Sequence, residues 1–83
     1  MTENISFRKL VRLLTQDLYL DHKTRGSHYI FWKPGTDLLV TIQPYGNDGV
    51  KAYQLKQLER ALVDRGLVSA QRWNTLLRKA RKW

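Results

Sequence analysis

The amino-acid sequence predicts an α+β two-layer fold, in which helices cover one face of an antiparallel sheet. Apolar residues recur at helical spacing near both ends of the chain. Three short extended stretches lie between these helical segments, and the links that join them are short enough for hairpins. A run of consecutive strands flanked by helices is typical of this class.

The first predicted helix runs from about Phe7 to Gln16. Ser6 or Asn4 is expected to cap its start, because each side chain offers an oxygen to the free backbone N–H groups of the first turn. The apolar residues that define this helix and its end are Phe7, Leu10, Val11, Leu13, Leu14 and Leu18.

The three extended stretches lie at Leu18–Lys23, Ser27–Lys33 and Leu38–Gln43. Thr24–Gly26 is short enough to join the first two as a hairpin. Lys33–Thr36 predicts a type II turn between the last two, because its proline presets the second turn position and its glycine takes the positive φ of the third.

Side-chain alternation divides the second stretch into two faces. Tyr29 and Phe31 point one way, whereas His28, Ile30 and Trp32 point the other way. Periodicity alone leaves the choice of the buried face open, because both faces carry large apolar side chains. We favour Tyr29 and Phe31 as core, which leaves an apolar patch beside His28.

A second helix is predicted from about Lys51 to Arg65, with Gly66 as its C-terminal cap. Ser69 is expected to cap a third helix, whose apolar stripe consists of Trp73, Leu76, Leu77 and Ala80. We therefore divide the chain into a helix–three-strand–helix domain, residues 1–68, and a basic C-terminal helix, residues 69–83, which packs on the same domain.

Charge is the strongest compositional signal. The 83 residues carry a formal net charge of +8, and the segment Ser69–Trp83 contains five cationic residues and no acidic one. Such a surface favours polyanions, namely nucleic acid, an acidic protein or an anionic membrane surface. The membrane is the least favoured of these, because a core this small needs the apolar stripe of the third helix.

The absence of cysteine and of long apolar runs excludes several kinds of site and segment. The chain has no cysteine, so disulfides and thiolate metal sites are excluded. No apolar run approaches the roughly 20 residues needed to cross a bilayer, and Met1–Arg8 lacks the apolar region of a secretory signal. We expect a cytoplasmic protein that does not associate with membranes.

The tripeptide Gly26-Ser27-His28 stands where a loop becomes a strand. Glycine suits a sharp reversal, serine can bind the local backbone, and the imidazole of a histidine exchanges protons near neutral pH. In a basic protein, this combination suits RNA binding and cleavage. The alternative is a histidine that merely begins a strand.

Residues around this tripeptide supply candidate RNA contacts. Cations can hold phosphates, an exposed aromatic ring can stack on an unpaired base, and a hydroxyl can bind a phosphate oxygen. The candidate contacts are Lys23, Arg25, Ser27, Trp32, Lys33 and Tyr45. The alternative for each is structural: solvated charge for the cations, core packing for Trp32, and a loop anchor for Tyr45.

We expect neither a metal nor a cofactor. Asp21, His22 and His28 do not have a recognisable zinc spacing, and no P-loop or glycine-rich dinucleotide motif is present. Alternation does not place His22 near His28, and we interpret His22 as structural.

The chain resembles the HicA (YcfA-like) toxins over about Phe7 to Leu67. The resemblance rests on Gly26-Ser27-His28 leading into an aromatic strand, on a Pro-Gly turn followed by Val40-Thr41-Ile42, and on a leucine-rich helix that closes on Gly66-Leu67. It implies a double-stranded-RNA-binding-domain-like fold and metal-independent cleavage of mRNA, with His28 as the catalytic residue. It also implies neutralisation by a HicB antitoxin that covers the active site.

Two departures from the family pattern affect this interpretation. The family often has Pro-x-His-Gly after the third strand, whereas this chain reads Pro44-Tyr45-Gly46, so a second imidazole is missing. The third helix also lies beyond the usual end of the family. A non-catalytic module that binds RNA or protein, such as a phage-borne inhibitor or adaptor on the same fold, is the alternative function.

Overall fold

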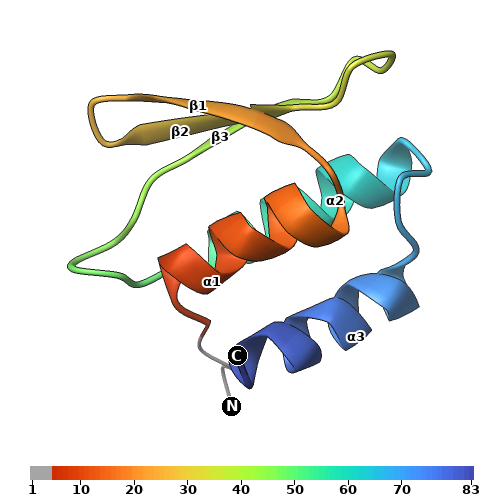
Figure 1. Ribbon diagram of the computed structural model, residues 1–83. Coiled ribbons are helices and arrows are strands. Elements are labelled where there is room, and N and C mark those ends of the chain that lie inside the picture. The colour runs from red at the N-terminus through yellow and green to blue at the C-terminus, as the bar shows by residue number, and fades with distance from the viewer. Residues whose placement is uncertain (1–4) are drawn as a thin grey trace.

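The computed structural model describes residues 5–83, and it has three antiparallel strands with helices on one side of the sheet (Figure 1). The predicted α+β class is therefore confirmed. Its elements are α1 (Phe7–Arg12), the π-helical η1 (Leu13–Asp17), β1 (Asp21–Arg25), β2 (His28–Trp32), β3 (Leu39–Ile42), α2 (Ala52–Asp64) and α3 (Ala70–Arg81).

The first helix starts at its predicted cap. The Ser6 hydroxyl accepts a hydrogen bond from the Lys9 backbone N–H at 3.1 Å, whereas Asn4 lies outside the described residues. After Arg12 the helix continues as η1, in which the N–H of Leu18 bonds the carbonyl of Leu13. This wider turn buries two consecutive leucines, Leu13 and Leu14, completely.

The predicted first strand, Leu18–Lys23, is displaced toward the C-terminus in the structure. Leu18 is the C-cap of η1, and Tyr19 has a φ of 58°, which ends the helix in the left-handed conformation. The N–H of Leu20 still bonds the carbonyl of Leu14. Because these three residues terminate a helix, pairing begins only at Asp21.

Tyr19→Gly is expected to stabilise the protein by about 0.5–1 kcal/mol. The left-handed conformation costs a residue with a Cβ roughly 1–2 kcal/mol, and glycine avoids this cost. Part of the stabilisation is lost because glycine gives up more conformational entropy on folding. Chemical denaturation measures the change. The reverse substitution at the C-terminus of α2, Gly66→Ala at a φ of 71°, should destabilise, and an unchanged midpoint for both variants would contradict the argument.

β1 and β2 form a hairpin with a two-residue turn, Gly26-Ser27. Gly26 has a φ of 62°, and positive φ at the first of two turn residues is the type II′ pattern, whose twist matches that of the strands. Arg25 pairs with His28 and Thr24 with Tyr29, so the first strand continues through two residues of the predicted link. Ser27, which we predicted at the start of the second strand, lies in this turn.

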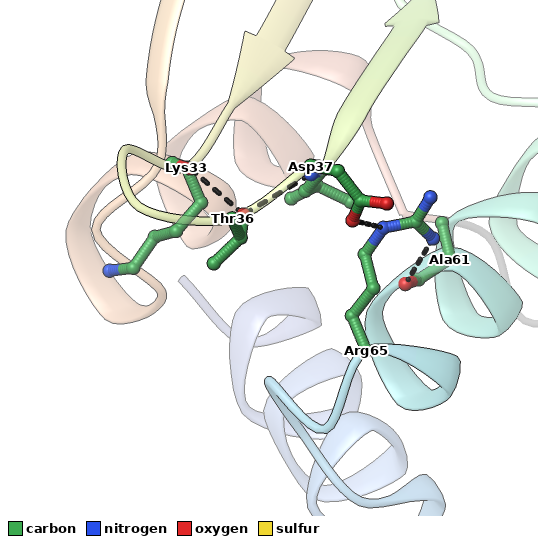
Figure 2. A network of polar contacts seen from close by, with 6 residues as sticks. Lys33, Thr36, Asp37, Ala61 and Arg65 are labelled. Carbon is green, nitrogen blue, oxygen red and sulfur yellow. Dashed lines mark hydrogen bonds and ion pairs between the residues drawn. The ribbon is translucent and has the colours of Figure 1, made fainter.

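The β2–β3 turn has the predicted type II geometry. The N–H of Thr36 bonds the carbonyl of Lys33 at 3.1 Å, and Gly35 has a φ of 85°. Figure 2 shows how the turn is joined to α2: Nε of Arg65 donates to Oδ1 of Asp37 at 2.8 Å, and its guanidinium also bonds the carbonyl of Ala61. This end of the sheet is thereby attached to the C-terminus of α2.

The core lies between the sheet and the helices. Phe31 is completely buried, and Tyr29 is half-buried with its ring 4.8 Å from that of Phe7. The predicted core face of the second strand is therefore confirmed. From α2, Leu58 and Leu62 complete the buried layer beneath the sheet.

α3 packs on the side of α1 and α2 that faces away from the sheet (Figure 1). The Ser69 hydroxyl accepts the N–H of Arg72 at 3.0 Å, which confirms the predicted cap. The predicted apolar stripe is buried in the same cluster as the residues of α1 and the sheet, and Trp73 is only 1% exposed. Within residues 5–83, no helix has the length and apolarity needed to cross a bilayer.

Candidate functional site

The sheet has one face without helices, and strand register determines which side chains lie on it. Directly paired residues in an antiparallel sheet point to the same side. His28 pairs with Arg25, and Ile30 pairs with both Lys23 and Thr41. We call this the open face, and its residues are Asp21, Lys23, Arg25, His28, Ile30, Trp32, Leu39 and Thr41.

His28 lies on the open face at the tip of the β1–β2 hairpin. Its imidazole is exposed, and it makes no side-chain hydrogen bond to any residue of the described part of the chain. Its position is set by the tight Gly26-Ser27 turn, because this turn makes His28 the first residue of β2. The ring is therefore accessible to a bound molecule.

Two cations lie beside His28 on β1. Arg25 is directly opposite it, where paired Cβ atoms are about 5 Å apart. Lys23 is one pair further along the same face, opposite Ile30. Both cations are exposed, and no acidic side chain in residues 5–83 forms an ion pair with either of them. The structure therefore groups His28, Arg25 and Lys23.

Trp32 shares the open face but lies at the other end of β2. It lies four positions after His28, which corresponds to about 13 Å along a strand. It is half-buried, and it pairs with Leu39, whose side chain is 66% exposed. The predicted apolar patch beside His28 is therefore present, with its largest ring distant from the imidazole.

Lys33 is positioned away from the group around His28. Its ammonium donates to the carbonyl of Leu18 at 3.3 Å and to that of Tyr19 at 3.4 Å. It also lies 5.8 Å from the centre of the Tyr19 ring. These contacts hold the last carbonyls of the first helix and give Lys33 a structural position at the far end of the sheet.

Tyr45 belongs to the loop between β3 and α2. It exchanges two backbone hydrogen bonds of 2.9 Å with Gly49, and its ring lies 4.3 Å from Nζ of Lys51. A Cβ at Gly49 would lie 2.8 Å from the Tyr45 carbonyl oxygen, so this position requires glycine. The ring is 61% exposed. Because Ile42 pairs with Tyr29, the loop leaves β3 at the sheet end that carries His28.

The second histidine lies on the opposite face of the sheet. His22 pairs with Phe31, and the two rings stack at 5.4 Å with an interplanar angle of 19°. It therefore contributes no imidazole to the open face, which agrees with its interpretation as a structural residue.

Sequence reasoning missed the residues that hold the Tyr45 loop. Asp48 accepts the N–H of Phe7 at its carbonyl and the N–H of Arg8 at its carboxylate, at 2.7 and 3.0 Å. Lys51, interpreted only as the start of a helix, places its ammonium over Tyr45. The Asn47-Asp48-Gly49 turn signal was visible in the sequence, but its partner on α1 lies 40 residues away.

The open face combines an exposed imidazole with two cations. An imidazole next to a guanidinium and an ammonium can exchange a proton at a phosphate ester whose negative charge the cations hold. Among residues 5–83, no group of three or more histidine, cysteine or acidic side chains is placed to hold a metal ion.

Comparison with known proteins identifies the family. The model of the family described as the HicA toxin of bacterial toxin-antitoxin matches residues 7–63. This match ends within α2 and does not include α3. No curated protein and no solved structure gives a significant match. Because the matched residues make up most of the chain, this protein belongs to the HicA toxin family and is the toxin of a toxin–antitoxin system.

Proposed function

We propose that this toxin is an endoribonuclease that cleaves mRNA with His28 as its single catalytic histidine. The observation that carries the proposal is the placement of an exposed imidazole opposite Arg25 and beside Lys23 on the open face. Family membership supports a toxin whose target is RNA, and the net charge of +8 suits a polyanionic substrate.

The proposed reaction uses the nucleophile that RNA itself carries. The ribose 2′-oxygen forms a bond to the adjacent phosphorus, and the bond from phosphorus to the 5′-oxygen breaks. A proton leaves the 2′-hydroxyl and another reaches the departing 5′-oxygen. His28 carries out one of these transfers as general base or general acid, and water supplies the other.

Residues of the open face, together with Ser27 and Tyr45 outside it, bind the substrate in this proposal. Arg25 and Lys23 hold phosphates on either side of the cleaved bond. Trp32 and the exposed Leu39 contact bases further along the strand, and Ser27 and Tyr45 contact the backbone near the hairpin tip. Lys33 acts indirectly, because its ammonium is engaged with the end of the first helix.

We further propose that the antitoxin is a HicB-like protein that covers the open face. The exposed Leu39 and the half-buried Ile30 and Trp32 give this face an apolar centre beside cations, which is the composition of a protein interface.

The reaction predicts a specific product and no requirement for a metal. Incubation with RNA in EDTA should leave fragments with 2′,3′-cyclic phosphate and 5′-hydroxyl ends, because the 2′-oxygen is the nucleophile. The same sequence with 2′-O-methyl groups should remain intact. Mass spectrometry of the products checks both. Cleavage of the methylated strand, or loss of all activity in EDTA, would contradict the proposed mechanism.

The alternative function is a non-catalytic module that binds RNA or protein through the same face. Two observations favour it: His22 lies on the other face, and Tyr45 stands at the position of the family's second histidine. No second imidazole of residues 5–83 therefore lies beside His28. Intact RNA after incubation with pure wild-type protein, combined with salt-dependent binding, would establish this alternative.

A further inference from the structure

α3 carries a second basic surface, remote from His28. It lies on the side of the helices that faces away from the sheet (Figure 1). We define the α3 basic surface by Arg72, Arg78, Lys79 and Lys82, all of which are exposed. Arg12 of α1 lies at its rim, with its guanidinium 4.3 Å from the centre of the Trp83 ring.

Most of these cations form no ion pair with an acidic side chain of residues 5–83. Lys79 forms an ion pair with Asp17 at 3.2 Å. Within residues 5–83, no ion pair involves Arg72, Arg78 or Lys82. Arg78 and Lys82 are four residues apart, so they are neighbours on the helix surface, where like charges repel unless an anion lies between them.

Stabilisation of the helix itself does not explain the pattern. Cations near the C-terminus of a helix interact favourably with its dipole, which accounts for Arg78 and Lys79. Arg72, however, lies in the first turn, where a cation is unfavourable and where this helix has no acidic residue. Cations in the first turn as well as at the C-terminal end indicate an external anion.

The residues of the α3 basic surface suit a phosphodiester backbone better than a protein or a membrane. A protein interface has an apolar centre, but the large hydrophobic side chains exposed among residues 5–83 are Tyr19, Leu39, Tyr45 and Tyr53, none of which is on α3. A helix that binds a membrane inserts its apolar face, whereas the apolar face of α3 is buried in the core. Binding to a phosphate backbone needs only cations.

We propose that the α3 basic surface binds the phosphodiester backbone of RNA at a distance from the cleaved bond. The proposal rests on the proposed function, because it takes the substrate RNA as the ligand. Its contribution is to affinity alone: the surface holds the RNA chain near the toxin while His28, on the opposite side of the helices, acts on another segment.

The test compares two double variants with the same change of charge. Arg78→Gln/Lys82→Gln removes two cations from the α3 basic surface and leaves the Lys79–Asp17 pair in place. Lys56→Gln/Arg60→Gln removes two exposed cations from α2 and is the matched control. The ligand is a fluorescent 2′-O-methyl RNA of about 20 nucleotides, whose binding does not depend on cleavage, and affinity is measured over a range of salt concentrations.

The α3 variant is expected to reduce the slope of log K against log salt by about 1.4, which corresponds to about 25-fold weaker binding at 0.1 M salt. The control should lose much less, and the cleavage rate at saturating RNA should stay the same in both. Equal losses for the two variants, or none for either, overturn the proposal. So does a loss of antitoxin affinity with unchanged RNA binding, which would assign the surface to a protein.

The two proposals fail in distinguishable ways. If wild-type protein cleaves RNA and the α3 variant binds it normally, only the α3 surface proposal is lost. If wild-type protein leaves RNA intact but the α3 variant binds it more weakly than the control does, the surface is established and the nuclease proposal is lost.

Discussion

His28→Ala is expected to lower the rate of RNA cleavage by about 10²–10⁴-fold, the usual contribution of a general acid or base. RNA affinity should change little, because Arg25 and Lys23 remain in place on the open face. Single-turnover cleavage of a labelled RNA measures the rate, and growth after induction of the variant reports its toxicity.

The second histidine of the chain provides the control for this experiment. His22→Ala removes the other histidine, which lies on the opposite face of the sheet against Phe31. We expect cleavage by that variant to stay within a few-fold of wild type, with a modest loss of stability from the missing ring contact. Equal activity of His28→Ala and wild type would exclude His28 as the catalytic residue, whatever the behaviour of His22→Ala.

Trp73→Ala is expected to reduce the free energy of unfolding by about 3–5 kcal/mol, the range for removing a large aromatic side chain from a core. Trp73 is 1% exposed and belongs to the same buried cluster as Leu10 and Phe31. In a domain of 83 residues, such a loss is a large fraction of the total stability. Thermal and urea denaturation measure it.

Asn74→Ala is the matched control for this change, because Asn74 is the next residue of α3 and its side chain is exposed. Its effect should lie within about 0.5 kcal/mol. A loss below about 1 kcal/mol for Trp73→Ala would show that α3 is a dispensable addition. Residues 1–68 would then be expected to fold alone, which the packing of α3 on α1 and α2 argues against.

The α+β class and the order of the elements follow from local sequence signals. Ser6 and Ser69 begin helices because a serine oxygen satisfies free N–H groups wherever the following residues are helical. The turn at Pro34-Gly35 is also a local signal, because proline restricts its own backbone angle and glycine permits the positive φ that this turn requires. These signals need no partner from elsewhere in the chain.

The predicted start of the first strand was wrong, because the observed start depends on how the preceding helix packs in the core. Leu18, Tyr19 and Leu20 look extended by composition, but the helix continues through η1, and its end uses Leu18 and Leu20 as donors. Tyr19 occupies the left-handed conformation that sequence signals reserve for glycine. Burial of Leu13 and Leu14 in the tertiary core outweighs that local preference.

The sequence alone determined the candidate catalytic histidine, because Gly26-Ser27-His28 is a local motif whose glycine makes the turn that positions the imidazole. Only the tertiary structure decided what surrounds that histidine. Strand register placed Arg25 and Lys23 beside it and put His22 on the other face, and the fold engaged the ammonium of Lys33 with the end of the first helix. Register depends on which face the core buries, a property of the whole fold.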